Sequence, residues 1–482
     1  MTTAAPPRPT VRIGQIVGFL VCVEIASGVL QGYYTPIFSD IADHLSIKDA
    51  SVNWFEAAQL VVSALVVPVL ARLGDLVGHR RVLLGSTTVT ALASWAVAFS
   101  PTFTTFLIAW AVQGFYVVWL PLEISIIHQR AAGTGQQTRL TRRAAAFLVA
   151  ALEGGVIVGA GISGAIVGAT SMTVVLMVPA IAVTACFAVV WFGIADTPPR
   201  GEGSLDLAGL ALAATTIGLV MGGLILVRVQ GPGSVLAWIL IALGIATLVP
   251  FARVERNRAE PLVDVRLLAT RAQWPVQVTA FLFGMSVLGA QIPLSTFART
   301  DPDETGYGLG ASAGFVSVLI VLYVLTMVLG ALTMPAVARR TGMRASMVLG
   351  AGLVGLGYGL FLPFHDQTAA VLVNMAIAGV GSGALVSSLP AAAAAAAPPD
   401  RTGFVTGMTN TTKTIGGAIA SSVFAIALSS AGSIADAKAG HAPLHGYLVV
   451  WSVCAATAFA AAAFLALSPR DAFGDDPALT AH

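Results

Sequence analysis

Four glutamates lie within long apolar stretches of this sequence, where a charged side chain is rare. They are Glu24, Glu56, Glu123 and Glu153. Moving a charge from water into a hydrocarbon layer costs about 2.5–3.5 kcal/mol on insertion scales, so such residues usually face a cavity, an ion path or one another. A carboxyl group held away from water can take up and release a proton. The four glutamates are therefore candidates for proton coupling.

Polar side chains near Glu24 recur at helical spacing. Ser27, Gln31 and Tyr34 follow Glu24 at steps of three or four residues, which places all four on one face of a helix. A polar stripe on an otherwise apolar helix indicates a wet cavity. The structural alternatives for Glu24 are a neighbouring helix that satisfies the carboxyl group, or a position nearer the membrane surface.

Glu56 and Glu123 also have polar neighbours at helical spacing. Gln59 follows Glu56 on a similar face, and Gln113 and Tyr116 share a face with Glu123. Both glutamates lie close to one end of their apolar run, so contact with water is the alternative to a functional role. The glutamines and the tyrosine are candidates to line a substrate cavity.

Glu153 lies deeper in its apolar run and is harder to explain by contact with water. Lys413 is also within a span, where it could pair with a glutamate across the protein or bind helix carbonyls. Trp110 could stack on a flat or cationic ligand, although aromatic residues in a span more often serve packing. The remaining candidates for the substrate cavity are Gln277, Gln291, Tyr323, Asn374 and Asn410.

The chain around these residues is too apolar for a soluble domain. Its 482 residues are 56% hydrophobic and 10% charged, with a mean hydropathy of +0.86, whereas a soluble domain has about 25% charged residues. The 50 glycines suit close packing of helices in lipid. We predict an all-α polytopic membrane protein that is surrounded by membrane lipid and does not bind nucleic acid.

Apolar runs long enough to cross the membrane, roughly 20 residues each, predict fourteen transmembrane helices. The expected spans are 13–37, 51–71, 82–99, 103–126, 144–167, 172–194, 206–227, 234–252, 274–298, 312–336, 346–363, 368–390, 403–430 and 445–467. Most of the 25 basic residues then fall on the side that carries both termini. By the positive-inside rule, we expect a plasma-membrane protein with both termini in the cytoplasm.

Catalytic and metal-binding signatures are missing from the sequence. The three cysteines have no metal-ligand spacing, and neither a Walker motif nor a Ser/His/Asp constellation is present. The expectation is a protein that is not an enzyme, uses no cofactor or metal and has no catalytic residues. It is expected to be a monomer.

A short charged turn separates two of the expected spans. Within residues 71–81 it carries Asp75, Gly78, Arg80 and Arg81. A weaker copy, with Gly342 in the place of Gly78, occupies residues 335–344 and contains Arg339, Arg340 and Arg344. Two related halves with parallel repeats are typical of transporters, whose substrate site lies between the halves near the middle of the membrane.

These residues resemble the major facilitator superfamily, in particular its 14-helix drug:proton antiporter family. The turn is similar to the loop signature G-x-L-(A/G)-D-R-x-G-R-(K/R) of that family. Gly155, Gly159 and Gly164 resemble its fifth-helix signature G-x-x-x-G-P-x-x-G-G. Asn410 and Lys413, followed by a glycine pair, resemble a pattern in the penultimate helix.

The resemblance implies two six-helix bundles, residues 1–194 and 274–482, joined by a linker with two additional helices, residues 195–273. It also implies that the charged turns form a conformational switch at the cytoplasmic mouth, made in one state and broken in the other; a turn that merely holds two helices is the alternative. The three glycines of the fifth helix are expected to form a close-packed interface between the halves.

Two departures from the family pattern concern proton coupling. Ser27 stands where the family usually has a first-helix aspartate, with Glu24 one turn earlier, and Trp110 stands where it has a fourth-helix arginine. The resulting prediction is a secondary exporter of small, largely apolar drugs or secondary metabolites, in exchange for protons, by alternating access. An uptake symporter or uniporter for a small metabolite is the alternative within the fold, and a non-transporting membrane protein is the alternative outside it.

Overall fold

The described part of the chain is an assembly of long helices. The computed structural model describes Gly14 and residues 17–132, 137–199, 205–258, 261–397, 401–429 and 442–468. Within these ranges, the only pairing outside helices and turns is an isolated bridge between Val167 and Thr170. Thirteen helices of the described ranges are long and apolar enough to cross a membrane. The expected all-α membrane fold is confirmed.

The first half is built from the N-terminal helices. In chain order they are α2 (Leu20–Tyr33), η1 (Thr35–Ile37), α3 (Phe38–His44), η2 (Asp49–Val52), α4 (Asn53–Val77), α5 (His79–Ala98), α6 (Phe103–Gln113), η3 (Gly114–Val118), α7 (Trp119–Arg130), α8 (Gln137–Ile166) and α9 (Met172–Gly193). The linker follows with α10 (Leu207–Gln230), α11 (Val235–Ala246), α12 (Leu248–Asn257) and α13 (Val265–Leu268).

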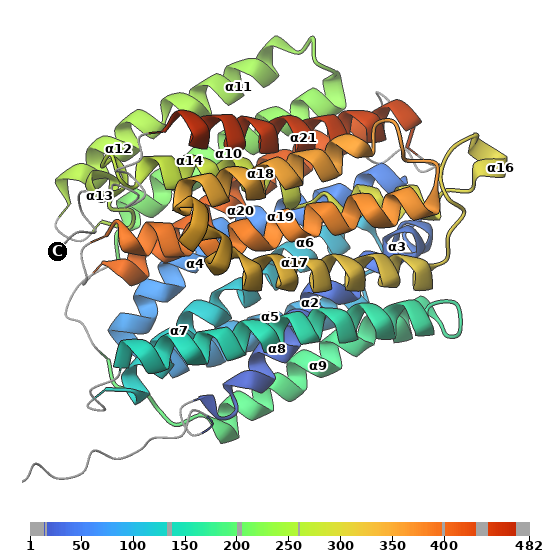
Figure 1. Cartoon of the computed structure of the whole chain (residues 1–482). Helices are drawn as coiled ribbons and strands as arrows, with labels where there is room; N and C mark the ends of the chain where they lie inside the picture. The colour runs from blue at the N-terminus through green and yellow to red at the C-terminus, as the bar shows by residue number, and fades with distance from the viewer. Residues whose placement is uncertain are drawn as a thin grey trace, which may run out of the picture.

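The second half repeats this plan. Its helices are α14 (Trp274–Val287), α15 (Gln291–Arg299), α16 (Pro302–Thr305), α17 (Ala313–Thr341), α18 (Met343–Leu360), α19 (Thr368–Ala395), α20 (Thr402–Leu428) and α21 (Leu444–Leu467). Figure 1 shows the long helices of both halves side by side along a common direction, with α9 at one edge and α11 at the other.

Local sequence signals explain where several helices begin and end. The side chains of Thr102, Asp206 and Ser312 each accept a hydrogen bond from a backbone N–H in the first turn of α6, α10 and α17, which satisfies a donor that the helix leaves free. Gly78 ends α4 with φ +103° and Gly342 ends α17 with φ +86°. Both values favour glycine, so the repeated turn follows directly from two glycines at equivalent positions.

Three of the expected spans are interrupted. The first passes through η1, which contains Pro36, and continues as α3, about two turns beyond its predicted end. The predicted span 103–126 contains the 3-10 segment η3, and the predicted span 274–298 breaks after Val287 at Gly289, whose φ is +80°. A Cβ on Gly289 would lie 2.0 Å from Ser421 Oγ of α20, so both the backbone angle and the space require glycine.

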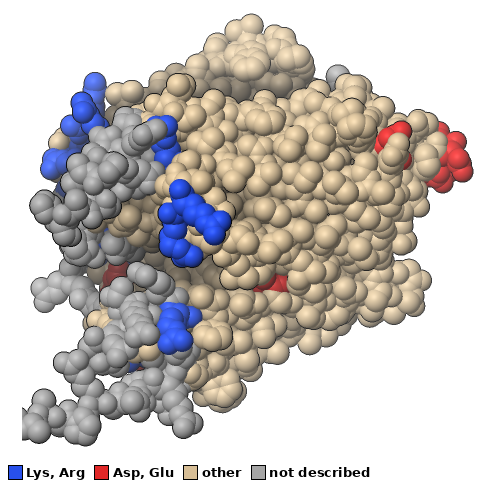
Figure 2. Space-filling model, in the orientation of Figure 1, with Lys and Arg blue, Asp and Glu red and all other residues tan. Residues whose placement is uncertain are grey.

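Charged side chains gather at the two ends of the helix assembly. Figure 2 shows Lys and Arg at one end, a small acidic group at the other, and a largely uncharged surface between them. We call the end with the turns at Gly78 and Gly342 the arginine-rich end, and the end with α3, α15 and α16 the opposite end. A wide uncharged belt between two polar rims is the surface expected of a membrane-spanning protein.

Candidate functional site

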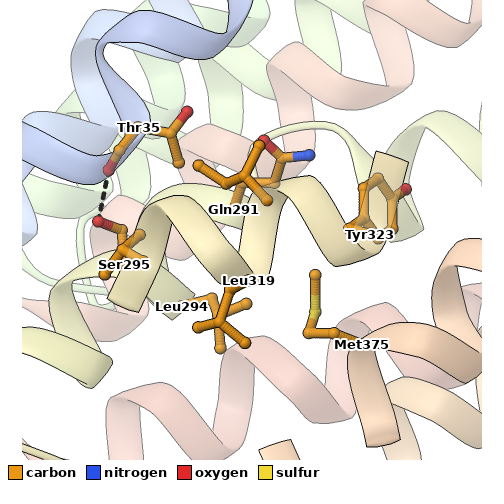
Figure 3. Close-up of a pocket in the computed structure, with 9 residues that line it drawn as sticks. Thr35, Gln291, Leu294, Ser295, Leu319, Tyr323 and Met375 are labelled. Atoms are coloured by element: carbon orange, nitrogen blue, oxygen red, sulfur yellow. Dashed lines mark hydrogen bonds between the residues drawn. The ribbon is translucent and has the colours of Figure 1, made fainter. Parts of the chain in front are cut away.

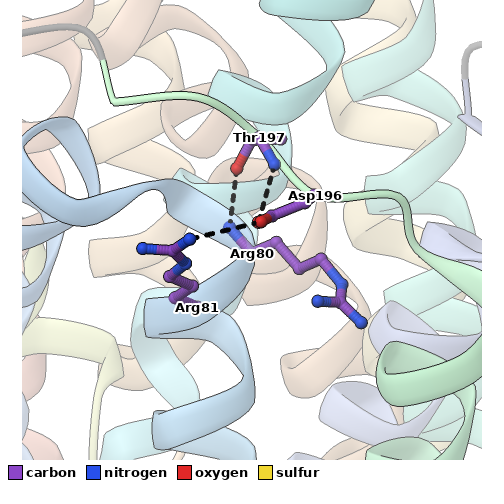
Figure 4. Close-up of polar contacts among 4 residues, drawn as sticks. All are labelled: Arg80, Arg81, Asp196 and Thr197. Carbon is purple, nitrogen blue, oxygen red and sulfur yellow. Dashed lines mark hydrogen bonds and ion pairs between the residues drawn. The ribbon is translucent and has the colours of Figure 1, made fainter.

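The charged turn after α4 is anchored to the end of α9. Arg80 donates from its backbone N–H to Thr197 Oγ1 (2.9 Å) and from Nη2 to the carbonyl of Trp191 (2.7 Å). Arg81 forms an ion pair of 3.5 Å with Asp196 (Figure 4). A Cβ on Gly78 would lie 2.4 Å from the carbonyl oxygen of Thr197, so glycine is needed for this close approach. The turn therefore fixes the start of α5 to the chain that leaves the first half.

Asp75 pairs with a histidine of the same turn. The distance from Asp75 Oδ1 to His79 Nε2 is 3.3 Å, and the His79 side chain is 2% exposed. Gln129 of α7 lies 3.1 Å from the other ring nitrogen of His79. This contact extends the turn to α7. The sequence did not single out His79.

The second turn is anchored in the equivalent way. Arg344 donates from Nη1 to the carbonyl oxygen of Ser468, the residue that follows α21. In each half, an arginine just after the glycine of the turn thus binds a backbone carbonyl at the end of the last helix of that half. Arg339 and Arg340 lie at the end of α17 and are exposed. The switch role of both turns remains a prediction.

A second feature, a close backbone contact between two glycine-bearing helices, occurs at equivalent positions in both halves. In the first half, a Cβ on Gly28 of α2 would lie 1.9 Å from the carbonyl oxygen of Leu152, and one on Gly155 of α8 would lie 2.4 Å from that of Ile25. These contacts bring the backbones of α2 and α8 together. Because the spacing is three residues on each helix, the two glycines face each other across the contact.

The second half contains the same reciprocal contact between α14 and α20. A Cβ on Gly284 would lie 1.9 Å from the carbonyl oxygen of Lys413, and one on Gly416 would lie 2.2 Å from that of Phe281. The spacing is again three residues on each helix. Leu152 of the first half therefore corresponds to Lys413 of the second.

Only one of the three predicted fifth-helix glycines lies between the halves. Gly155 and Gly159 contact α2 of the same half, Gly159 beside Val29. Gly164 alone approaches α17, where a Cβ would lie 2.2 Å from Ser317 Oγ. The expectation that all three form the interface between the halves is wrong, because Gly155 and Gly159 lie on the face of α8 that packs on α2 of its own half.

Glu24 and Glu123 come together inside the first half. Both carboxyl groups, from α2 and α7, are fully buried, and the charge of Glu24 acts on Glu123. None of their four carboxyl oxygens has a hydrogen-bond partner among the described residues. The charge of Arg130, at the end of α7, acts on Glu123. Two buried carboxylates at close range repel each other, so protonation of one relieves the repulsion, and this arrangement is suited to binding a proton.

This position differs from the surroundings expected from the sequence. Contact with water was the alternative considered for Glu123, but its side chain is 0% exposed. Glu24 was expected in a wet stripe, but it too is 0% exposed, whereas Gln31 on the same stripe is exposed. Because Glu24 and Gln31 share one face of α2, the difference lies in what packs against that face two turns apart along the helix.

Glu153 and Lys413 face each other from opposite halves. Each side chain is half-buried, and their charges attract each other across the space between α8 and α20. Within the described ranges, neither forms a direct ion pair or a side-chain hydrogen bond. Tyr323 of α17 also lies within electrostatic reach of Glu153. Glu153 and Lys413 are thus an acid and a base contributed by different halves.

Glu56 lies apart from the other glutamates. It is half-buried on α4, and its charge acts on Tyr116 of η3, which is buried. Tyr116 also feels the charge of Glu24. Glu56 and Tyr116 therefore lie on the side of the first half where the carboxyl pair is found, but they do not join it.

A narrow pocket lies between the halves beside Tyr323. It is lined by Thr35, Gln291, Leu294, Ser295, Val316, Leu319, Ile320, Tyr323 and Met375. Figure 3 shows Thr35 of η1 and Ser295 of α15 joined by a hydrogen bond at one side of the pocket, with Tyr323 and Met375 farther along it. Two of the three interrupted spans, those broken at η1 and at Gly289, contribute to the lining. Thr35 and Ser295 place this pocket toward the opposite end of the helix assembly, and interrupted helices commonly line transporter binding sites.

Several predicted cavity residues instead hold the first half together in this structure. Gln113 donates to Tyr34 Oη (3.0 Å) and to Ser94 Oγ (2.9 Å). Gln59 donates to the carbonyl of Trp110 at 3.3 Å. These five side chains are buried. Ser27 is also buried and accepts a 3.5 Å contact from Gln31.

The predicted cavity residues of the second half lie in two places. Gln277 accepts a hydrogen bond from Thr412, next to Lys413, at 3.0 Å, and Asn410 lies one turn from Lys413 on α20 with its side chain half-buried. Asn374 is buried and donates to the carbonyl of Phe364 at 3.4 Å, away from the pocket. Gln277 and Asn410 are therefore the predicted cavity residues that lie nearest Lys413 along these helices.

Hydrogen bonds and an ion pair join the halves at the opposite end. Arg299 of α15 donates to Asp40 Oδ1 of α3 at 2.8 Å. Ser295 donates to the carbonyl of Thr35, and Ser317 donates to that of Ala160 at 2.7 Å. In each of these three contacts, the two partners come from different halves. This end is therefore closed in the structure.

Comparison with known proteins identifies the family. The sequence model described as the Major Facilitator Superfamily matches residues 20–421, and a second match covers residues 278–479. The chain belongs to the Major Facilitator Superfamily. The resemblance drawn from the loop and fifth-helix motifs is thereby confirmed, and the repeated turns and glycine contacts correspond to the two halves of a superfamily transporter.

Relatives within the superfamily include exporters and a nucleoside transporter. The chain is 27% identical over 382 residues to the cephamycin export protein of Amycolatopsis lactamdurans, covering 78% of this chain and 76% of that protein. It is 24% identical over 409 residues to a probable actinorhodin transporter of Streptomyces coelicolor, covering 80% and 67%. It is 23% identical to a uridine/deoxyuridine transporter of Lactococcus lactis over 65% of this chain and 66% of that protein, slightly less than two thirds of its length.

Solved structures show the same fold. The POT family transporter PepTSo aligns with a TM-score of 0.67 at 13% identity, over 96% of this chain and 99% of that chain. The nucleoside transporter NupG aligns with a TM-score of 0.62 at 14% identity, over 95% and 99%. At this level of identity, the likeness concerns the path of the backbone and the transporter architecture.

The sequence did not point to Arg130, Asp40 or Arg299. Arg130 was counted among the arginines outside the spans, and Asp40 lay beyond the predicted end of the first helix. A signal was present at Asp40: the helical pattern continues past Pro36, which is tolerated at the first turn of a new helix. Nothing in the sequence alone linked Asp40 to Arg299, because they are far apart in the chain.

Proposed function

We propose that this chain is a secondary active exporter of small molecules that exchanges its substrate for protons through the Glu24–Glu123 pair. The observation that carries this proposal is the meeting of two buried carboxyl groups from α2 and α7, with the charge of Arg130 beside them. Two carboxylates at such close range repel each other, so the pair binds a proton readily and releases it when the two groups separate. Export of drugs or antibiotics is supported by the relatives named for such transport.

Alternating access requires the two ends to open in turn, and the contacts between the halves at the opposite end can be made in one state and broken in the other. By the excess of arginine, we assign the arginine-rich end to the cytoplasm, with both termini there and the protein in the plasma membrane as a monomer. The contacts Arg299–Asp40, Ser295–Thr35 and Ser317–Ala160 then close the outer end. With this assignment, the closed end of the protein is the outer one.

The first transmembrane segment connects the proton site to this closure. Glu24 lies on α2, Thr35 lies on η1, and Asp40 lies on α3, so one continuous stretch of chain carries all three. Protonation changes the attraction between α2 and α7 at Glu24. A shift of α2 relative to α7 is transmitted along the same segment to the contacts with α15, which is the physical link between proton binding and opening.

The turns at the cytoplasmic end complete the proposed switch. Arg80 and Arg344 each bind a carbonyl at the end of the last helix of their half. They hold each half as one body while the halves rotate against each other. In this role, the turns stabilise the moving units.

Uptake is the second candidate, and one observation favours it: the relative named a uridine/deoxyuridine transporter. The absence of the family's fourth-helix arginine at Trp110 points the same way. Arg130, at the other end of the same interrupted span and within reach of Glu123, offers a basic residue for proton exchange at a different place. This geometry favours exchange over co-transport.

Reconstituted vesicles separate these functions. The full chain is inserted in vesicles with an acid lumen, and a cephamycin, a quinolone or uridine is added as a probe while a lumenal dye reports pH. Exchange predicts that a transported probe discharges the gradient. Glu24→Gln and Glu123→Gln should each slow this discharge at least roughly tenfold, in line with the loss of a group that carries a proton in each cycle.

Glu304→Gln is the matched control, because Glu304 lies on α16 at the opposite end and is exposed. Unchanged discharge in both Glu24→Gln and Glu123→Gln would contradict coupling through the pair. Accumulation of uridine inside right-side-out cells, driven by external acid, would establish the uptake symporter instead.

A further inference from the structure

The acid and the base that face each other between the halves sit at nearly the same place in the two repeats. The carbonyl of Leu152 contacts Gly28, and the carbonyl of Lys413 makes the equivalent contact with Gly284. Glu153 is the residue after Leu152. Because the repeated contact fixes the depth of each helix, Glu153 and Lys413 lie at closely matching depths on either side of the boundary between the halves.

The space between these two side chains is not closed by a direct contact. Both are half-buried, and neither is among the described residues that form an ion pair or a side-chain hydrogen bond. Charged groups that are partly withdrawn from water and left without a direct partner are costly. Their cost is reduced only by the attraction between them, so a ligand that supplies a partner to each would be strongly favoured.

The neighbouring polar groups fit such a ligand. Tyr323 lines the pocket between the halves, and the charge of Glu153 acts on it; Asn410 lies one turn from Lys413. Leucine, isoleucine, valine and methionine side chains form most of the pocket wall, together with a threonine, a glutamine and a serine. Glu153 and Lys413 lie outside this lining and supply one acidic and one basic anchor from different halves.

We propose that the substrate is a zwitterionic amphiphile whose anionic group binds Lys413 and whose cationic group binds Glu153. This inference rests on the proposed transport function and names the class of molecule that the same site takes. An anion alone would leave Glu153 next to a second negative charge, and a cation alone would face Lys413. A neutral molecule would leave both charges without a partner when the site closes. Only a molecule with both charges satisfies each half of the protein.

A substrate bound at this site would contact both halves of the protein. Glu153 moves with α8 in the first half, and Lys413 moves with α20 in the second. A zwitterion therefore bridges the two moving bodies. A ligand with one charge is held by one half only.

A matched series of fluorescent probes tests the charge preference directly. Dansyl-ε-lysine carries both charges, dansylcadaverine carries only the cation, N-dansyl-6-aminohexanoate carries only the anion, and N-butyl dansylamide carries neither. Each is titrated into the purified full-length protein in detergent without a proton gradient. We expect dansyl-ε-lysine to bind at least roughly tenfold more tightly than the other three, as expected for one added charge-assisted hydrogen bond.

Two substitutions test which protein side chain binds which charged group of the probe. Lys413→Met should reduce the affinity for dansyl-ε-lysine to that for dansylcadaverine, and Glu153→Gln should reduce it to that for the aminohexanoate probe. Lys413→Arg should keep the preference. Lys48→Met and Glu304→Gln, which remove the same charges outside the site, should leave all four affinities unchanged.

The charge-swapped double variant, Glu153→Lys with Lys413→Glu, controls for a folding defect in the single variants. It retains one charge of each sign and should again prefer dansyl-ε-lysine. Equal binding of the four probes by the unsubstituted protein, or no binding of dansyl-ε-lysine, would overturn the proposal. So would an equal loss of all four probes in Lys413→Met if that variant keeps its thermal stability.

The outcome is separable from that of the transport experiment. The probe titration measures binding at equilibrium and needs neither export nor proton coupling. A charge preference that depends on Lys413 and Glu153 would stand even if Glu24→Gln and Glu123→Gln left the proton gradient unaffected. Conversely, proton exchange without the charge preference would support the transport proposal and exclude a zwitterionic substrate class.

Discussion

The two halves make the same backbone contact but place different side chains beside it. Gly28 and Gly155 bring α2 against α8, and Gly284 and Gly416 bring α14 against α20, with Cβ positions 1.9–2.4 Å from the facing carbonyl oxygens. The first half carries the glutamates of the spans, whereas the second carries Lys413. The repeats therefore share their helix packing and differ in the ionisable side chains that lie beside it.

The turns at the arginine-rich end show the same division on a smaller scale. Gly78 and Gly342 have the same type of backbone, and Arg80 and Arg344 both bind a carbonyl at the end of their half. Arg80 has a second contact through its backbone to Thr197, and Arg81 has an ion pair with Asp196. The turn of the first half is thus fixed by three contacts, made through Arg80 and Arg81.

The largest effects are expected where the repeated contact itself is broken. Gly28→Ala and Gly284→Ala each place a Cβ 1.9 Å from a carbonyl oxygen, so the helices must separate. We expect each to lower the free energy of unfolding by roughly 1–3 kcal/mol. Thermal unfolding of the purified protein in detergent measures the effect, and similar losses in the two variants would support equivalence of the halves.

Matched controls exist in both halves. Gly85 of α5 and Gly352 of α18 have nothing within 4 Å of an added Cβ. Gly85→Ala and Gly352→Ala should be neutral or stabilise by up to about 1 kcal/mol, because alanine favours the helix. A loss in the controls as large as in Gly28→Ala would show that the contact is not what makes the glycine necessary.

Smaller effects are expected at the arginine anchors, where water competes for the same hydrogen bonds. Arg80→Met and Arg344→Met should each destabilise their half by about 1 kcal/mol. Arg81→Met should cost less, because the Arg81–Asp196 pair is 64% and 54% exposed. Unfolding curves for the three variants test this order, and a larger loss at Arg81 than at Arg80 would reverse our description of the anchor.

The smallest effect concerns the ion pair that joins the halves at the opposite end. Burial raises the pKa of Asp40 above its ordinary value, an effect that the charge of Arg299 offsets only in part. Protonation therefore favours folded Asp40 over the unfolded chain while it weakens the pair with Arg299. Acidification should loosen this end without unfolding the protein, at a pH above the usual range of an aspartate.

Hydrogen exchange at α3 and α15 as a function of pH measures this loosening. Arg299→Met should give the faster exchange at neutral pH and remove most of its dependence on acid. The change should be within about tenfold, as expected for a partly exposed ion pair worth roughly 1 kcal/mol. A pH profile that is the same in Arg299→Met and in the unsubstituted protein would exclude Asp40 as the responsible group.

Much of the architecture was predictable because lipid imposes it. A span must be apolar over its whole length, so hydropathy located the long helices, and glycines at Gly78 and Gly342 located the repeated turn. The interruptions were less visible. A break such as that at Gly289 depends on the close approach of Ser421, which lies far away in the sequence.

The sequence was sufficient to predict which residues belong to the candidate site, but not which of them lie close to one another. An ionisable residue in a span is conspicuous in the sequence, and Glu24, Glu123, Glu153 and Lys413 were identified in this way. Which of them meet depends on how neighbouring helices pack at each depth. The sequence placed Gln31 and Glu24 on one face, yet the packing around α2 buries Glu24 and leaves Gln31, two turns further along the same face, exposed.

The repeated glycine contact has a consequence for how such a protein can change over evolutionary time. Because the contact is made by backbone atoms, the side chain of the residue that supplies the carbonyl is free to vary: it is a leucine at position 152 and a lysine at position 413. If Lys413 anchors the substrate as proposed, substitutions at this position can change what the protein recognises while the backbone contact that holds the two helices together is kept.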